Sequence, residues 1–139
     1  MSLVLDSSAT LAWIYQDEVS DVTQQIFELV ANSRAWVPAI WRLEVANGLQ
    51  TGVRRGRIDA AYRDLALGDL ALLDISIDQD TDKYAWSSTL RLADRFRLTL
   101  YDAAYLELAQ RRSLPLASLD EDLCAAARGL DVLLIGVST

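Results

Sequence analysis

Four acidic residues stand where the fold could bring their carboxylates together: Asp6, Glu44, Asp102 and Asp120. Asp6 and Asp120 each follow a short apolar stretch that is typical of a strand. In an open parallel sheet, ligands bind beyond the carboxyl ends of the strands, so we expect these two side chains to face one crevice. Clustered carboxylates raise one another's pKa unless a cation lies among them. The pattern therefore indicates a site for a hard divalent cation, which prefers oxygen ligands.

Each acid also has an ordinary structural explanation. Asp6 and Asp120 are well placed to cap the helices that follow them, and Asp102 could belong to a capping box that begins at Thr99. Glu44 could lie on a surface stripe, although its apolar neighbours indicate partial burial, where a carboxylate needs a partner or a metal. The joint arrangement, rather than any single acid, favours a site.

The composition removes several classes of chemistry. The chain has no histidine, which excludes serine–histidine and cysteine–histidine nucleophiles and histidine-based zinc sites. Its one cysteine, Cys124, lies in an alanine-rich run that predicts a small buried thiol. Lys83 is the sole lysine, so a P-loop is unsupported. Carboxylates and hydroxyls remain as the groups that could do chemistry.

The net charge of −7 argues against a general affinity for nucleic acid, because phosphate backbones attract basic surfaces. This objection weakens if several of the acids share one pocket and bind cations, since a bound metal ion makes the electrostatic potential in that pocket attractive to phosphate. Arginines gather in two places, which are candidate phosphate contacts or else solvated helix faces. The two groups are Arg54, Arg55 and Arg57, and Arg91, Arg95 and Arg97.

Alternating strands and helices predict an α/β fold with a mainly parallel sheet, in a single domain over residues 1–139. The expected strands are 1–5, 35–40, 72–77, 114–119 and 132–137. The expected helices run from Ser7 or Ser8 to about Ser33, over 41–52, on both sides of 72–77, over 99–112 and over 121–128. No apolar run approaches the roughly 20 residues that span a bilayer, and no basic leader precedes Asp6. We therefore expect a soluble, cytoplasmic protein with no membrane partner.

Four sequence motifs resemble those of PIN domains, and within that family the VapC-type toxins of bacterial toxin–antitoxin pairs. The first is Leu3-Val4-Leu5-Asp6-Ser7-Ser8, and the second is Glu44-x-x-Asn47-x-Leu49. The third and most specific is Leu92-Ala93-x-x-Phe96 followed by Tyr101-Asp102-Ala103-Ala104-Tyr105-x-x-Leu108-Ala109, and the fourth is Ser118-Leu119-Asp120-x-x-Leu123. Together they extend over nearly the whole chain.

This resemblance implies a three-layer α/β/α sandwich with an acidic pocket that binds Mg²⁺ or Mn²⁺ and hydrolyses RNA through a metal-activated water. It also implies a homodimer that is silenced by a cognate VapB-type antitoxin. The residues that match the family's catalytic and metal-binding acids are Asp6, Glu44, Asp102 and Asp120, with Ser7, Asn47, Ser118 and Asp122 as accessory candidates. Ser118 stands where the family often has threonine and keeps a hydroxyl that can orient a neighbouring carboxylate. For Asp122 we favour a role at the start of the last helix.

Three other interpretations compete. A haloacid-dehalogenase-type phosphatase needs a second aspartate where this chain has Ser8, and a response-regulator receiver domain needs a late lysine that Lys83 does not match. The third is a non-catalytic protein-interaction module, favoured by the negative charge and by four tryptophans, Trp13, Trp36, Trp41 and Trp86. Of these, Trp13 and Trp41 lie near site acids and are either partner anchors or core residues.

Overall fold

Four parallel strands form the central sheet in a computed structural model of the chain, which describes residues 2–135. The strands are β1 (Ser2–Leu5), β2 (Arg34–Val37), β3 (Ile75–Ile77) and β4 (Leu116–Ala117). Their order across the sheet is β3-β2-β1-β4, with Leu3 opposite Ala35 and Leu5 opposite Ala117. Because all four strands run the same way, their carboxyl ends share one edge.

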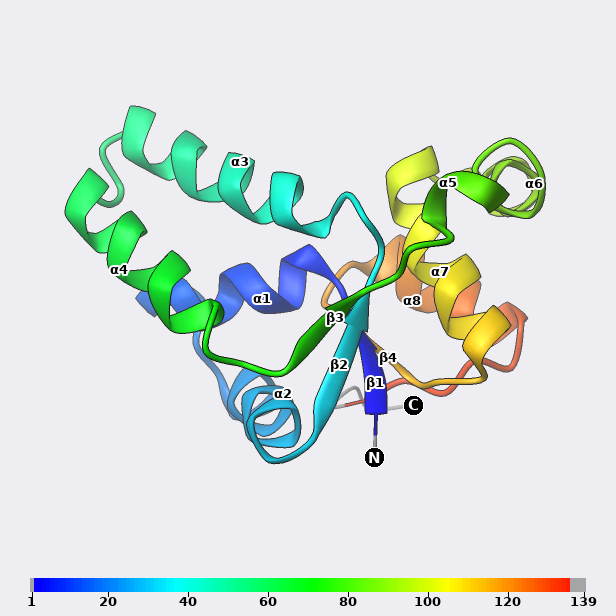
Figure 1. Cartoon of the computed structure of the whole chain (residues 1–139), viewed down its shortest axis with the longest axis horizontal. Helices are drawn as coiled ribbons and strands as arrows, with labels where there is room; N and C mark the ends of the chain where they lie inside the picture. Colours follow the sequence, from blue (N-terminus) through cyan, green and yellow to red (C-terminus); the bar gives the residue numbers. More distant parts are fainter. Residues whose placement is uncertain (1, 136–139) are drawn as a thin grey trace.

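Helices cover both faces of this sheet and give the predicted three layers. They are α1 (Ser7–Ile14), the 3₁₀ turn η1 (Gln16–Glu18), α2 (Asp21–Asn32), α3 (Trp41–Arg54), α4 (Ala60–Leu70), α5 (Thr81–Tyr84), α6 (Ser88–Phe96), α7 (Leu100–Arg112) and α8 (Glu121–Gly129). Figure 1 shows α1 to α4 on one side of the sheet and α6 to α8 on the other. Among residues 2–135, no helix is long and apolar enough to cross a membrane.

The core lies where β1 and α7 pack together. Leu3, Val4 and Leu5 are completely buried, and every residue of α7 from 103 to 109 is buried. Helix α7 therefore has little freedom to shift, because it is packed against β1, α6 and α8. This matters for the site, since the first turn of α7 carries Asp102.

A buried ion-pair cluster anchors the other part of α7 to the sheet. Asp78 follows β3 and accepts hydrogen bonds from Arg111 at 2.6 and 3.1 Å and from Arg112 at 3.3 Å. Glu107 also binds Arg111, at 2.7 Å. Burial by itself raises the pKa of Asp78, but hydrogen bonds and charge from Arg111 outweigh it and hold the pKa below its ordinary value. A buried carboxylate thus keeps its charge because its partners remain in place.

The structure corrects several predicted boundaries. The long first helix is wrong: the chain leaves α1 at Tyr15, and a new helix begins after Ser20, which forms a capping box with Thr23. Strand β2 starts at Arg34 and ends at Val37, because Pro38 cannot donate a ladder hydrogen bond. The predicted strands over 72–77 and 114–119 shorten to three and two residues.

The last predicted strand, over 132–137, is reduced within the described residues to one parallel bridge between Leu116 and Leu134. Residues 136–137 lie outside the described range. Three helices rather than two surround β3, with α4 before it and α5 and α6 after it. Cys124 is buried, as the alanine-rich run predicts.

Candidate active site

Four helices carry the four predicted acids at their N-terminal ends. Asp6 caps α1 and Asp120 caps α8, while Glu44 and Asp102 lie in the first turns of α3 and α7. Unpaired backbone N–H groups give each helix N-terminus a partial positive charge, which stabilises nearby carboxylates. Asp6 and Asp120 could therefore each cap a helix and also bind a cation, because a capping carboxylate keeps oxygen lone pairs for a second partner.

Asp6 is the most enclosed of these acids. Its Oδ1 accepts hydrogen bonds from the Ser8 hydroxyl at 2.7 Å and the Ala9 N–H at 2.9 Å, and its Oδ2 accepts one from the Ser118 hydroxyl at 2.5 Å. Burial raises the pKa of Asp6 to about 6, although all three hydrogen bonds act to lower it. The carboxylate is thus fixed in orientation and costly to ionise in the absence of a cation.

Two serine hydroxyls connect Asp6 to the loop that carries Asp120. The Ser118 oxygen accepts from the Asp120 N–H at 3.0 Å, and the Ser8 oxygen accepts from the Leu119 N–H at 3.0 Å. The predicted role of the Ser118 hydroxyl in orienting a carboxylate agrees with its bond to Asp6. Ser8 has the same role and was not among the predicted site residues, although it stands in the first motif.

Glu44 is held from across the site by Tyr105. The Tyr105 hydroxyl on α7 donates to Glu44 Oε1 at 2.5 Å. Burial raises the pKa of Glu44, the hydrogen bond from Tyr105 lowers it in part, and the charge of Asp102 raises it further. Burial and the bond to Glu44 also raise the pKa of Tyr105, so this hydroxyl stays protonated and acts as a donor. Sequence reasoning gave Tyr105 no role, although it lies one turn after Asp102.

Asp102 is the common electrostatic neighbour of the other acids. After burial, the charge of Asp120 is the largest influence that raises the pKa of Asp102, with a smaller one from Asp122. The charge of Asp102 in turn raises the pKa of Asp6 and Glu44, beyond the larger effect of burial on each. The other three acids of the predicted quartet therefore each lie close enough to Asp102 for their charges to interact with it.

The donor set fits a hard divalent cation by its chemistry. All candidate ligands are oxygens, and the mutual repulsion of the acids favours a positive charge among them. Within residues 2–135, however, no three acidic or cysteine side chains stand close enough to coordinate one ion directly. Mg²⁺ commonly uses one or two carboxylates and keeps several waters, so wider spacing is compatible with this ion.

The accessory candidates differ in their placement. Ser7 is half-buried, and hydrogen bonding to it contributes to the pKa values of Glu44 and Tyr105. Asn47 is exposed on α3. Asp122 is exposed in the first turn of α8, the position for which we favoured a helix role, and it also acts on Asp102 through its charge.

The two tryptophans near the site pack inward rather than outward. Trp41 is buried, and its Nε1–H donates to the Thr10 hydroxyl at 3.1 Å. Trp13 is partly buried and packs edge-on against Phe27, with ring centroids 5.2 Å apart. Core packing therefore accounts for Trp41, whereas Trp13 and Phe27 together line a surface cavity of about 200 Å³.

The chain matches a known protein family over most of its length. The family model described as PIN domain matches residues 3–129. No curated protein gives a significant match. Among solved structures, PAE2754 from Pyrobaculum aerophilum is 22% identical, with a TM-score of 0.64 over 91% of this chain and 84% of that one.

Two further solved structures are similar over almost their full length. VapC20 of Mycobacterium tuberculosis, a toxin that cleaves the sarcin–ricin loop, is 15% identical with a TM-score of 0.64 over 99% of both chains. A toxin–antitoxin complex from Klebsiella pneumoniae contains a chain that is 18% identical, with a TM-score of 0.62 over 99% of both chains. At these identities the likeness shows the shared α/β/α fold.

Proposed function

The chain belongs to the PIN-domain family, and from this membership we propose that it is a Mg²⁺- or Mn²⁺-dependent endoribonuclease and the toxin of a toxin–antitoxin pair. The observation that carries the proposal is the group of acids Asp6, Glu44, Asp102 and Asp120, which four helix N-termini present at one edge of the sheet. The similarity to a cleaving toxin and to a toxin–antitoxin complex supports the same activity and partner.

The proposed roles follow from how each acid is held. Asp6, Asp102 and Asp120 would bind the cation together with water, Asp6 with its orientation fixed by Ser8 and Ser118. The chemistry that a bound Mg²⁺ or Mn²⁺ supplies is activation of water and neutralisation of charge on the phosphodiester. Burial raises the pKa of Glu44, so this carboxylate accepts a proton more readily than an exposed one. We therefore assign Glu44 the role of accepting a proton from the attacking water. Tyr105 is a positioning residue for Glu44.

The chemical groups at the ends of the cleaved RNA test the proposed hydrolysis. Purified protein is incubated with a mixed cellular RNA pool in Mg²⁺, in Mn²⁺ or in chelator, and the new ends are sequenced. We expect 5′-phosphate and 3′-hydroxyl ends, because attack by water does not need the RNA's own 2′-hydroxyl. Cyclic-phosphate ends, or full activity in chelator, would overturn the proposal.

Matched variants separate this activity from a contaminating nuclease. Asp102→Asn removes a site acid and should abolish cleavage, whereas Asp69→Asn makes the same change at an exposed position on α4 and should leave it intact. If both variants cleave like the wild type, the acids are not the active site. If wild type, variants and a mock preparation are all inactive with every metal, the non-catalytic interaction module becomes the better interpretation.

We also propose the partners of this activity: an RNA substrate, a second copy of the chain in a homodimer, and a small antitoxin of the VapB type. The similarity to a chain of a toxin–antitoxin complex supports the last of these. The chemical argument is that a pocket of mutually repelling carboxylates attracts a guanidinium as readily as a metal ion.

A further inference from the structure

A cavity of about 510 Å³ adjoins the acidic site between α1 and α3. The polar and charged residues that line it include Ser8, Glu18, Arg55, Arg57 and Asp120. Because the Ser8 hydroxyl also binds Asp6, the cavity opens directly beside the carboxylate cluster. A cavity of this size is in the usual range for sites that bind small molecules or parts of larger ones.

Two glycines that line the cavity let α3 approach α1 closely along its wall. A Cβ atom at Gly48 would collide with the Leu11 side chain, and one at Gly52 would collide with the Tyr15 hydroxyl. That hydroxyl instead donates to the Gly48 carbonyl at 2.7 Å. The wall of the cavity is therefore a packed, hydrogen-bonded contact and not a loose gap between helices.

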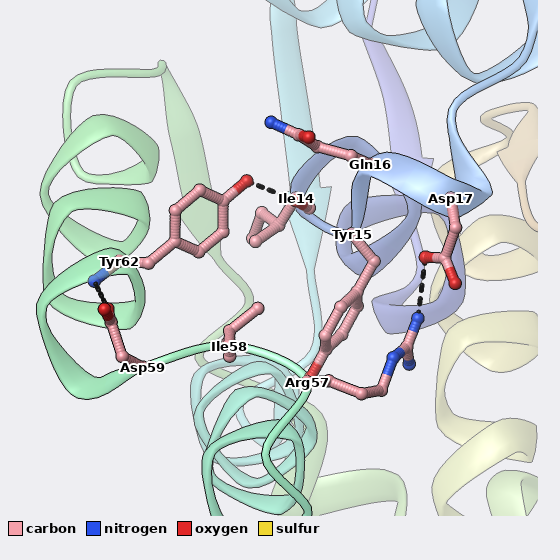
Figure 2. Close-up of a pocket in the computed structure, with 8 residues that line it drawn as sticks. All are labelled: Ile14, Tyr15, Gln16, Asp17, Arg57, Ile58, Asp59 and Tyr62. Carbon is pink, nitrogen blue, oxygen red and sulfur yellow. Dashed lines mark hydrogen bonds and ion pairs between the residues drawn. The ribbon is translucent and has the colours of Figure 1, made fainter.

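The two arginines that line the cavity differ in their partners. The Arg57 guanidinium lies 3.9 Å from the centre of the Tyr15 ring and is bound by Asp17 at 2.8 Å and Glu18 at 3.2 Å. Figure 2 shows it along the tyrosine ring and beside Asp17. Arg55 is exposed at the end of α3 and makes no ion pair within residues 2–135. Its charge is thus unneutralised beside an acidic site.

A second cavity of about 580 Å³ continues beyond Arg57. It shares Tyr15 and Arg57 with the first and extends to Asp59 and Tyr62 on the α4 side. The Tyr62 hydroxyl donates to the Ile14 carbonyl at 2.5 Å, which holds the start of α4 against the end of α1. Tyr15 and Arg57 line both cavities, and we call the two cavities together the groove.

We propose that this groove binds the RNA strand next to the cleaved bond, with Arg55 binding a backbone phosphate; this rests on the proposed nuclease function. A guanidinium matches the geometry of phosphate oxygens and can bind two of them at once. In a chain of net charge −7, a strand that enters the acidic site needs local positive partners, and Arg55 supplies one in the cavity beside that site. Arg57 is already bound by Asp17 and Glu18 and stacked on Tyr15, so it shapes the wall of the groove and leaves Arg55 as the arginine that binds phosphate.

Binding is tested separately from cleavage. A fluorescein-labelled, mixed-sequence single-stranded RNA of twelve nucleotides is titrated with protein in chelator, and fluorescence anisotropy gives Kd over a series of KCl concentrations. The loss of one phosphate contact on a single strand lowers the salt slope by about 0.7. We therefore expect Arg55→Gln to raise Kd about fivefold at ~0.1 M salt and to flatten the slope by that amount. Arg55→Lys should keep the slope, since it keeps the charge.

Arg91→Gln is the matched control. Arg91 is equally exposed, makes no ion pair within residues 2–135, and lies on α6, across the sheet from the groove. The proposal is overturned if Arg55→Gln binds like the wild type, if Arg91→Gln has the larger defect, or if the wild type does not bind this RNA. A wild type that binds RNA through Arg55 but never cleaves it would contradict the nuclease function alone. In cleavage assays, the expected effect of Arg55→Gln is a raised KM with little change in kcat.

Discussion

Burial makes the ionisation of Asp6 unfavourable in the folded state, and this predicts how the stability of the protein depends on pH. Its folded-state pKa of about 6 lies above the ordinary value of 3.8, so between these values the folded state holds a proton that the unfolded state has lost. The preference of the folded state for protonated Asp6 stabilises the protein below about pH 4, and this stabilisation is lost as the pH rises through about 6. The shift corresponds to about 3 kcal/mol.

We therefore expect metal-free wild type to lose up to about 3 kcal/mol in its free energy of unfolding between pH 4 and 7, relative to Asp6→Asn. Urea denaturation in chelator measures this difference, in which the other titrating groups cancel. Asp69→Asn, at an exposed position, should follow the wild type. Parallel pH profiles for wild type and Asp6→Asn would show that the pKa of Asp6 is not raised.

Metal binding gives a second residue-scale prediction. A ligand that binds only the folded state at tenfold above its Kd adds about 1.4 kcal/mol, or about 4 °C in Tm for a chain of this size. Mg²⁺ should therefore raise the Tm of the wild type and of Asp69→Asn, and raise that of Asp102→Asn much less. Thermal unfolding followed by circular dichroism measures this. Equal Tm shifts in all three proteins would place the metal site elsewhere.

The identities of the candidate acids could be predicted at the residue scale, but their supporting contacts could not. Asp6 and Asp120 follow strands and precede helices, and that position alone predicts both a helix cap and a place in a ligand site at the edge of the sheet. The bond from Tyr105 to Glu44 joins residues 61 apart in sequence, on two different helices. Such a contact depends on how α3 and α7 cross the same edge of the sheet, which spacing along one helix does not reveal.

At the scale of elements, the order of strands and helices was predicted better than their ends. Residues 7–33 looked like one helix because their apolar residues continue through Tyr15 and Val19. The break depends on Ser20 and Thr23, whose reciprocal hydrogen bonds start α2 with a threonine in place of the usual Glu or Gln. Among residues 2–135, β4 pairs with β1 and forms one bridge to Leu134.

The close approach of α1 and α3 predicts opposite effects of the same substitution at two glycines. Gly52→Ala would displace the Tyr15 hydroxyl from the Gly48 carbonyl, so it should destabilise the protein by about 1–3 kcal/mol. Gly68→Ala, in α4, meets open space and should stabilise it by about 0.5–1 kcal/mol, because alanine favours helix. Urea denaturation of both variants measures these signs. A neutral Gly52→Ala would mean that α1 and α3 separate easily.

At the scale of the whole molecule, the negative charge is divided between neutralised and unneutralised acids. Asp17, Glu18, Asp74, Asp78 and Glu107 are paired with arginines. The acids of the proposed active site instead lie near one another, and the charges of Asp120 and Asp122 raise the pKa of Asp102 in addition to burial. The site is therefore where a cationic partner gains most, whether that partner is a metal ion or an arginine.

The last prediction concerns that cationic partner, a small antitoxin whose tail places an arginine among the carboxylates. A bidentate pair between guanidinium and carboxylate would occupy the oxygens that otherwise bind the cation, so the inhibited complex should resist added Mg²⁺. The test is to express the chain alone and together with the small open reading frame expected beside its gene, and to follow growth. Growth should stop only when the chain is expressed alone, and Asp102→Asn should relieve that arrest, whereas Asp69→Asn should not. A harmless wild-type chain that never co-purifies with its neighbour's product would contradict the toxin assignment, even if purified protein still cleaves RNA, because cleavage in vitro does not require an antitoxin.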